Sequence, residues 1–265
     1  MEKEFLKRFI SSFVLLPIVL GSFYLGGLFF IVLISLVVVI SMIEWDSIIK
    51  LNNYSILYIL RTYLCIPILF FLFYLSEDNY FIIFLFVVLF LTFIISFQEK
   101  KYAYPTLGYI FIFCPAISIV FIRFSSEFEY VIVISFFTLV WLSDIGGYCV
   151  GKIIGGPKLI PSISPGKTLS GAFGSILFPV ITIFIANIFI KFNNLILVIV
   201  LTILISILAQ LGDLSESLFK RKFGVKNSGY IIPGHGGILD RIDSFVYTLP
   251  FFLFLYFSDK VKLWY

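Results

Sequence analysis

Four acidic side chains and a histidine make one short segment of this chain the best suited to chemistry. Residues 211–244 hold four of the fifteen carboxylates and the only histidine, although 61% of all residues are hydrophobic. Asp213 and Glu216 are three residues apart, so they share one helix face if the preceding helix extends that far. Asp240 and Asp243 have the same spacing. Carboxylates from two helix ends suit a Mg²⁺ ion that also binds nucleotide phosphates, because water and phosphate oxygens complete its octahedron.

The same acids have a second interpretation, in which they pair with neighbouring cations on a solvated face. Lys220, Arg221 and Arg241 are close to them in sequence. Spacing alone leaves both interpretations open. A charged cluster at the end of a membrane helix is costly, however, because each ion loses hydration unless a partner, a metal or a water-filled cavity restores it. We therefore expect a functional site.

Two glycine-containing stretches are suited to binding anions. Residues 164–168 read Ser-Pro-Gly-Lys-Thr and precede an apolar run, so N–H groups at a helix start can bind an anionic oxygen beside Lys167. The spacing does not match a Walker motif, and a plain loop before a helix is the alternative. Residues 233–237 read Pro-Gly-His-Gly-Gly. Here His235 can act as a base, as a hydrogen-bond donor to a phosphate or as a structural turn residue. We favour the hydrogen-bond donor, because a metal-assisted phosphoryl reaction needs no strong base.

The elements that must position these residues are membrane helices. The chain has 265 residues, a mean hydropathy of +1.11 and only 13% charged residues, about half the share in a soluble domain. Its apolar runs are near or above the ~18 residues that cross a bilayer. We therefore predict an all-α, polytopic integral membrane protein that forms a single domain, residues 1–265. The nine predicted spans are residues 9–25, 27–43, 56–75, 80–97, 106–122, 130–143, 169–190, 194–212 and 244–258.

Loop charges predict the orientation of these spans. With a cytoplasmic N-terminus, fourteen of the nineteen Lys and Arg residues fall in inner segments, which agrees with the known bias of basic residues to the cytoplasmic side. The N-terminal segment has a basic start and an apolar run without a small-residue cleavage site, so we expect an uncleaved first helix. The whole chain has a net charge of +4, which favours binding to anionic lipid headgroups. No basic and aromatic platform for nucleic acid is apparent in the sequence.

Two connections are long, and both are predicted to be cytoplasmic loops: residues 144–168 and 213–243. We therefore divide the domain into an N-terminal helical half, residues 1–143, and a catalytic half, residues 144–244. Long loops in a compact domain commonly carry function. Glycines in the first loop are expected to allow tight turns and close approach of the backbone; they are Gly146, Gly147, Gly151, Gly155 and Gly156. The three cysteines, Cys65, Cys114 and Cys149, have no metal-binding or disulfide spacing and are predicted to be apolar fillers.

The polar blocks of the catalytic half resemble the phosphatidate cytidylyltransferases, also called CDP-diacylglycerol synthases. Two blocks match the family signature in order and spacing: Ser217-Leu-Phe-Lys-Arg221 with Lys226, and His235-Gly-Gly-Ile-Leu-Asp-Arg-Ile-Asp243. Residues 144–146, 164–168 and 212–217 are also similar to the family. The resemblance covers roughly residues 144–244. Two departures are Asn227, where the family has Asp, and Leu169-Ser170, where it has Trp-Glu; they bear on turnover more than on the type of reaction.

The resemblance implies a role for each matching residue. Asp213 and Asp240 would hold a divalent metal, with Asp144, Glu216 and Asp243 beside it. Phosphates of the two substrates would face Lys167, Lys220, Arg221, Lys226, His235 and Arg241, and further substrate contacts would come from Ser164, Thr168, Ser217, Gly236 and Gly237. The implied reaction transfers CMP from CTP to phosphatidate, which gives CDP-diacylglycerol and pyrophosphate. The implied cofactor is Mg²⁺, and a second, monovalent ion and a homodimer are left open.

Two other functions are weighed against this one. A CTP-dependent kinase of a polyprenol or another lipid alcohol needs a comparable nucleotide site but leaves no CMP on the lipid. An ion-coupled transporter would carry charges near the bilayer midplane, whereas the acids here cluster at one face. The expected location is therefore a bacterial-type inner membrane, with the active site facing the cytoplasm.

Overall fold

The computed structural model of the protein describes residues 2–50, 103–124, 129–232 and 236–258. These residues are helical except for one small hairpin and the connecting turns, which confirms the predicted all-α class. The chain divides into two units. The first is Met1–Tyr130 with Val225–Arg241, and the second is Val131–Gly224 with Ile242–Tyr265.

In the described part of the first unit, the long helices are α1 (Glu2–Leu25), α2 (Gly27–Ile48) and α6 (Ala103–Phe124). A sharp turn separates α1 from α2, because Gly26 adopts a left-handed φ of 61°. The carbonyl of Phe23 at the end of α1 accepts a hydrogen bond of 2.7 Å from Nε of Arg123 on α6. Along α2, the Trp45 indole donates to the Tyr104 carbonyl (3.0 Å) and lies against Gly108, where a side chain would overlap it.

The second unit contains α7 (Glu129–Ile154), a hairpin of β1 (Lys158–Ile160) and β2 (Ser164–Thr168), α8 (Leu169–Ile190), α9 (Leu195–Lys222) and α11 (Phe245–Phe257). A four-residue helix, α10 (Leu239–Ile242), precedes α11. Side-chain oxygens cap two of these helices: Thr168 accepts from the Gly171 N–H at the start of α8, and Asn194 from the Leu197 N–H at the start of α9.

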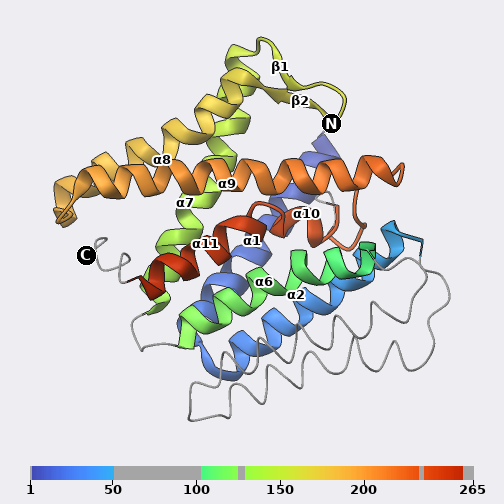
Figure 1. Ribbon diagram of the computed structural model, residues 1–265, viewed down its shortest axis with the longest axis horizontal. Helices are drawn as coiled ribbons and strands as arrows, with labels where there is room; N and C mark the ends of the chain where they lie inside the picture. The colour runs from blue at the N-terminus through green and yellow to red at the C-terminus, as the bar shows by residue number, and fades with distance from the viewer. Residues whose placement is uncertain (1, 51–102, 125–128, 233–235, 259–265) are drawn as a thin grey trace. The chain divides into compact units, whose positions relative to one another are not determined.

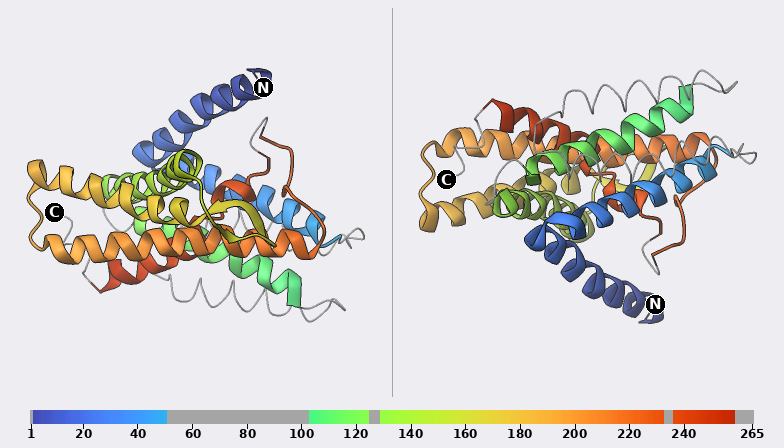
Figure 2. Two further views of the ribbon diagram at one scale, coloured as in Figure 1. Left: turned by 90° about the horizontal axis from the view of Figure 1, so that it is seen from above. Right: turned by 90° about the horizontal axis from the view of Figure 1, so that it is seen from below.

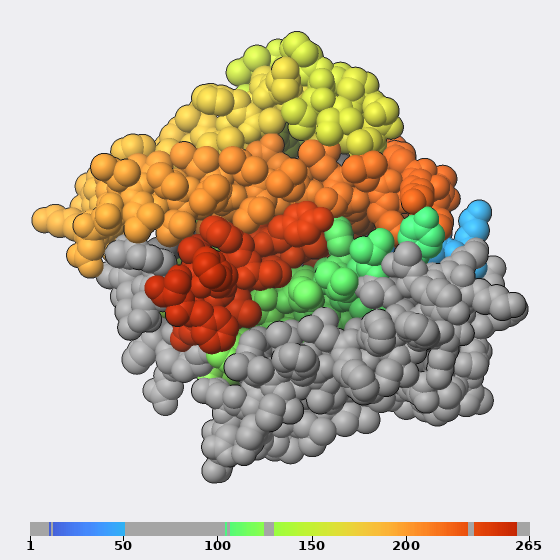
Figure 3. All heavy atoms as spheres, viewed as in Figure 1, coloured from blue at the N-terminus to red at the C-terminus, as the bar shows by residue number. Residues whose placement is uncertain are grey.

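The long helix α9 is central to the second unit. It packs against both α8 and α11, and α8 and α9 lie side by side in every view (Figures 1 and 2). One face of α9 is visible along its whole length in the space-filling view (Figure 3). Stacked rings join α7 to α11, where Phe136 lies 4.2 Å from Phe252 and Phe137 lies 4.4 Å from Phe245 between ring centroids.

Small residues let α7 and α8 approach closely. A side chain at Gly146 would overlap the Gly174 carbonyl, and one at Gly147 would overlap the Ser175 hydroxyl. Such glycine contacts are typical of helix pairs in membranes, where close backbone approach replaces the missing hydrophobic drive. The predicted close approach is confirmed for Gly146 and Gly147. The prediction of turns is wrong for Gly146, Gly147 and Gly151, which lie within α7. It holds for Gly155 and Gly156, which follow α7 with φ of 65° and 100°.

Five described helices are long and apolar enough to cross a membrane: Gly27–Ile48, Leu107–Phe124, Tyr130–Ile154, Leu169–Ile190 and Leu195–Lys222. The predicted polytopic integral membrane protein agrees with them. Two apolar helical stretches in the described part are shorter, Phe13–Leu25 and Phe245–Phe257. The predicted spans at residues 56–75 and 80–97, with Arg61 and Cys65, lie outside the described residues, so the total of nine stays a prediction.

Three helices continue past the predicted ends of their spans. The helix of the span 27–43 continues to Ile48, that of the span 130–143 to Ile154, and that of the span 194–212 to Lys222. Charged and glycine residues lowered the local hydropathy there, but a helix satisfies its own backbone hydrogen bonds and can extend beyond the apolar layer. Much of the two segments predicted as long loops is therefore helical. The Ser-Pro-Gly-Lys-Thr block is strand β2 instead of a plain loop.

Candidate functional site

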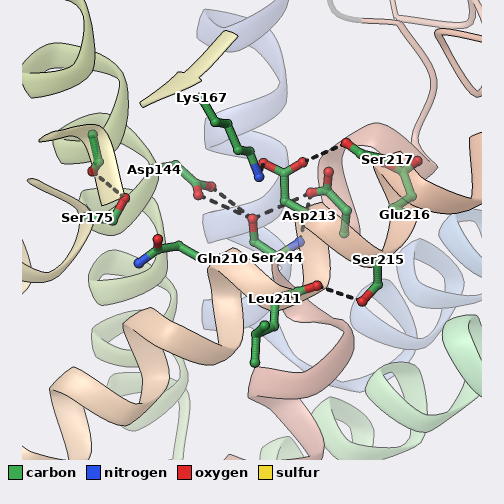
Figure 4. Close-up of polar contacts among 12 residues, drawn as sticks. Asp144, Lys167, Ser175, Gln210, Leu211, Asp213, Ser215, Glu216, Ser217 and Ser244 are labelled. Carbon is green, nitrogen blue, oxygen red and sulfur yellow. Dashed lines mark hydrogen bonds and ion pairs between the residues drawn. The ribbon is translucent and has the colours of Figure 1, made fainter. Parts of the chain in front are cut away.

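Carboxylates from three parts of the second unit gather in one polar cluster (Figure 4). Asp144 projects from α7, Asp213 and Glu216 from α9, and Asp243 from the residues just before α11. The Ser244 hydroxyl lies 3.2 Å and 3.3 Å from the two Asp144 carboxylate oxygens, and its backbone N–H donates to Asp243 (2.8 Å). The extension of α9 thus confirms the condition on which Asp213 and Glu216 share a helix face.

Gly212 allows this gathering. A side chain there would overlap the Asp243 carbonyl, so only glycine lets the chain before α11 lie directly on α9. This contact brings Asp243 beside the acids of α9. The sequence assigned Gly212 no role beyond ending a span.

Asp243 experiences the excess negative charge of the cluster. Burial raises the pKa of its carboxyl well above the ordinary 3.8, and the negative charges of Asp213, Glu216 and Asp144 raise it further. The hydrogen bond from the Ser244 N–H acts in the opposite direction. Without a cation, Asp243 is therefore inclined to keep a proton. A cluster of this kind is suited to a positively charged ligand or to a phosphate that arrives with one.

Lys167 brings one positive charge to the cluster from the hairpin. Its ammonium lies 2.6 Å from Asp213 Oδ2, and the Ser217 hydroxyl lies 3.3 Å from Asp213 Oδ1 (Figure 4). The side chains of Lys167 and Asp213 are 26% and 34% exposed, so a ligand in solvent can reach both. The hairpin is fixed to the helices, because Arg221 on α9 donates through Nε to the Ile163 carbonyl (3.2 Å).

Lys220 and Glu216 form a buried ion pair on α9. The ammonium lies 2.6 Å from Glu216 Oε2, and Glu216 has no exposed surface. The second interpretation weighed from the sequence, acids paired with neighbouring cations, thus describes these two residues, although they are buried instead of solvated. Their predicted parts in catalysis and phosphate binding stay predictions.

Asp240 lies in the first unit, at the start of α10. Its Oδ2 accepts backbone hydrogen bonds from Ser228 (3.1 Å) and Gly237 (2.9 Å). Gly236 has a φ of 84°, and a side chain there would come within 2.5 Å of Asp240 Oδ2. Because α10 ends at Ile242, Asp240 and Asp243 are not on one continuous helix. Asp240 is thus tied to its own glycine-rich turn.

The remaining predicted residues have varied surroundings. Thr168 is buried, and its hydroxyl caps α8, which is a structural role. Ser170, at the position where the family has an acid, donates to the Gly155 carbonyl instead. Ser164 begins strand β2 opposite Ile160. Two residues predicted to face substrate phosphates, Lys226 and Arg241, are exposed. A third, His235, lies outside the described residues.

The carboxylates fit a hydrated divalent cation better than a fully enclosed one. Among the described residues, no three Asp, Glu, His or Cys side chains converge to enclose an ion by themselves. Mg²⁺ commonly takes one or two protein carboxylates and completes its shell with water and substrate phosphates. Asp213 belongs to the second unit and Asp240 to the first, and their sharing of one ion stays a prediction.

Glu44 contacts the surroundings of Asp240, and no motif in the sequence pointed to it. This residue of α2 is 3% exposed, and it accepts hydrogen bonds from three groups near Asp240: the Ser228 hydroxyl and the N–H groups of Ile238 and Leu239. A carboxylate at the end of an apolar run was the signal that could have found it. The predicted span of residues 27–43 ends one residue before Glu44, whereas α2 continues to Ile48.

The fold and the acidic cluster together define a polytopic helical membrane protein. Its polar site is rich in carboxylates, is suited to binding a cation, and is built from helix ends and one hairpin. Over residues 6–258, the sequence matches the model of the Cytidylyltransferase family. The chain belongs to this family.

Curated relatives carry a more specific name. Over 115 residues the chain is 52% identical to a phosphatidate cytidylyltransferase of Staphylococcus haemolyticus, 51% identical to one of Staphylococcus epidermidis and 50% identical to one of Staphylococcus aureus. Each match covers 43% of this chain and 44% of the relative. The chain is thus matched over somewhat less than half the length of these relatives.

Proposed function

We propose that this protein is a phosphatidate cytidylyltransferase, which transfers CMP from CTP to phosphatidate. The observation that carries the proposal is family membership over residues 6–258. Relatives of that name, 52% and 50% identical to the chain over 115 residues, add to it. The site is compatible with it. A lysine and several carboxylates meet at the ends of membrane helices, where a water-soluble nucleotide and a lipid headgroup can both arrive.

In the proposed reaction, an oxygen of the phosphatidate phosphate attacks the α-phosphorus of CTP. The bond from the α-phosphorus to the bridging oxygen breaks, and pyrophosphate leaves with the electron pair of that bond. Both reactants are anions, so the site must offset their repulsion. The Lys167 side chain is about one-quarter exposed, so its ammonium can exchange the Asp213 carboxylate for a phosphate oxygen. The Asp213 carboxylate would then be released toward a cation.

The proposed cofactor is Mg²⁺, held by Asp213 and Asp240, with Asp144 and Asp243 contributing negative charge nearby. The raised pKa of Asp243 supports this assignment, because it reflects acids placed together without an equal number of cations. When bound, a divalent ion would supply charge neutralisation for the phosphates. The acidic residues would orient the phosphates through the bound ion.

The assay that tests the proposal follows the nucleotide label. Purified protein in detergent is incubated with phosphatidate and CTP labelled at the α position, with Mg²⁺ or with a chelator. We expect label to enter the lipid phase only with the metal. We expect Asp213→Ala and Asp240→Ala to lower the rate at least about 100-fold, as removal of a group that stabilises the transition state does.

A matched control and a second label complete the assay. Ser215→Ala is the control: Ser215 lies on α9 two residues from Asp213, donates to the Leu211 carbonyl and accepts from the Tyr247 hydroxyl, and its loss should leave most of the activity. CTP labelled at the γ position should leave no label on the lipid, whereas a lipid kinase would transfer it. Absence of the α label from wild-type lipid would remove the proposed function. Full activity in Asp213→Ala and Asp240→Ala would remove the proposed site only.

We further propose that the nucleotide reaches the site from the cytoplasm and the lipid enters from the membrane. The β1–β2 hairpin and the turn at Lys191–Asn194 lie at opposite ends of α8, which is long enough to span a bilayer. A variant without native cysteines can carry one new cysteine, at Lys158 or at Asn193. An impermeant maleimide added to intact cells should label the cysteine at 193 and not the one at 158. The reverse pattern would contradict this orientation.

A further inference from the structure

Glu44 is a buried acid that the proposed reaction does not use. It lies one turn before the end of α2, in a helix whose mean hydropathy is among the highest of the described spans. Its carboxylate accepts from Ser228 Oγ (2.9 Å), the Ile238 N–H (3.0 Å) and the Leu239 N–H (2.9 Å). Burying a carboxylate costs free energy unless donors replace its water, and here three donors do so.

All three donors belong to the segment that holds Asp240. Ser228 begins this segment, and Ile238 and Leu239 immediately precede Asp240 at its end. Ser228 contacts both acids, because its hydroxyl donates to Glu44 while its backbone N–H donates to Asp240 Oδ2. The Gly237 N–H donates to the same oxygen of Asp240. Two carboxylates therefore fix both ends of the glycine-rich segment.

Two glycines of the segment are explained by Glu44. A side chain at Gly229 would come within 2.5 Å of Glu44 Oε1, and one at Gly237 would overlap Glu44 Oε2 and the Ser228 hydroxyl. Gly229 has an ordinary negative φ, so its backbone conformation does not require glycine. Space beside the Glu44 carboxylate does require it. The glycines and Glu44 thus form one closely fitted unit.

We propose that Glu44 is a positioning residue of the active site: its carboxylate on α2 holds Ser228, Ile238 and Leu239 in the arrangement that presents Asp240 to the nucleotide-bound cation. The proposal rests on the proposed function for the role of Asp240, whereas the Glu44 contacts stand without it. Glu44 acts through the backbone and touches neither substrate. Its charge matters because a carboxylate accepts several N–H bonds at once, more strongly than a neutral group does.

A neutral side chain of the same size cannot replace Glu44. In Glu44→Gln, one oxygen remains to accept from Ile238, but the amide NH₂ faces the Leu239 N–H, so two donors oppose each other. Glu44→Ala removes every acceptor. Ser228→Ala removes one donor and leaves both backbone contacts. The expected order of effect is therefore Glu44→Ala, then Glu44→Gln, then Ser228→Ala.

The first test is kinetic and separates positioning from loss of folded protein. With rates normalised to folded protein, Glu44→Gln should raise the Mg²⁺ concentration for half-maximal rate by about 10-fold or more, the usual effect of removing a group that orients a metal ligand. Ser41→Ala is the matched control, because Ser41 is fully buried in α2, three residues from Glu44, and its hydroxyl has no hydrogen-bond partner among the described residues. Its Mg²⁺ requirement should equal that of the wild type. An unchanged requirement in Glu44→Gln would overturn the proposal.

The second test needs no activity. Hydrogen–deuterium exchange by mass spectrometry reports on the N–H groups of Ile238 and Leu239. Peptides covering residues 228–241 should exchange faster in Glu44→Gln, while peptides from α8 and α9 should not change. Unchanged exchange of residues 228–241 in Glu44→Ala would also overturn the proposal. If the wild type makes no CDP-diacylglycerol but the exchange result holds, the proposed function fails and the positioning contact stands.

A double-mutant cycle guards against variants that merely unfold. Gly229→Ala should lower the unfolding temperature in the wild-type background, because the new methyl group meets the Glu44 side chain. In a Glu44→Ala background the same change should have a much smaller effect, since that contact is gone. Additive effects of the two substitutions would show that the contact is absent in solution and would contradict the proposal.

Discussion

Asp213 and Asp243 show how neighbours give two carboxylates of one cluster different properties. Asp213 is one-third exposed and faces the Lys167 ammonium at 2.6 Å. Asp243 faces other acids, and burial together with their charges raises its pKa. Asp213 is therefore the acid of the cluster that an incoming ligand can reach beside a lysine. Asp243 is the one that responds to the charge state of the whole cluster.

Lys167 should matter for nucleotide binding and for turnover. Lys167→Met removes the ammonium that pairs with Asp213, so we expect kcat/KM for CTP to fall at least about 100-fold, comparable with loss of one electrostatic donor. Lys158→Met is the matched control, on the other strand of the same hairpin. Steady-state kinetics with CTP varied is the measurement. Equal losses in both variants would assign the effect to the hairpin and not to Lys167.

The raised pKa of Asp243 predicts a pH-dependent stability. Because the folded-state pKa exceeds the ordinary value of 3.8, protonation of Asp243 favours the folded state; this contribution is complete below the unfolded pKa and is lost as pH rises through the raised pKa. With a chelator present, wild-type protein should therefore lose stability relative to Asp243→Asn as pH rises. The slope is at most about 1.4 kcal/mol per pH unit for one proton. Thermal unfolding across pH checks this, and parallel curves for the two proteins would contradict it.

At the scale of elements, the glycines of α7 and α8 determine how closely these helices pack. Gly146→Ala would place a methyl group against the Gly174 carbonyl and the Phe178 side chain. We expect a loss of about 1–3 kcal/mol, the usual cost of overpacking. Gly21→Ala is the control, since nothing lies within 4 Å of the added methyl group, and it should be neutral or slightly stabilising. A detergent unfolding series compares them, and equal stability of the two variants would disprove the close packing.

Hydropathy predicted the described membrane helices well and their ends poorly. The run at residues 169–190 coincides with α8, because an apolar stretch of that length must hydrogen-bond its own backbone in lipid. Glycine weakens helices in water, and its concentration in residues 146–156 therefore indicated a loop. In α7 the same residues are retained for contact with α8. No single-sequence pattern distinguishes a glycine that turns from one that packs.

At the scale of the whole molecule, the order of residues does not follow the division into units. The second unit is interrupted at Gly224, and the chain returns to it at Ile242 after residues 225–241 of the first unit. The family resemblance therefore names the polar residues as a set, and it does not say which of them meet. Asp240 and Asp243 are three residues apart yet belong to different units. Glu44 is nearly two hundred positions from Asp240 in sequence and carries no motif of its own.

The proposed sharing of one cation by Asp213 and Asp240 predicts non-additive loss of binding. Mg²⁺ should raise the unfolding temperature of the wild type, because a ligand that binds only the folded state stabilises it. Each of Asp213→Asn and Asp240→Asn should remove most of that rise, and the double variant should lose little more. Thermal unfolding over a Mg²⁺ titration measures this. Two independent, additive losses would mean that the acids do not bind a common ion.

Helix α9 is a continuous rod of 28 residues that contains both an apolar stretch long enough to cross the membrane and two acids of the site, Asp213 and Glu216. Such a rod is about 42 Å long, whereas the hydrocarbon layer is about 30 Å thick. The lipid therefore sets how far Asp213 protrudes into water, because a thicker bilayer draws the rod inward or tilts it. Reconstitution in lipids of graded acyl length should accordingly change the rate of the proposed reaction, so that the thickness of the surrounding membrane would regulate this protein.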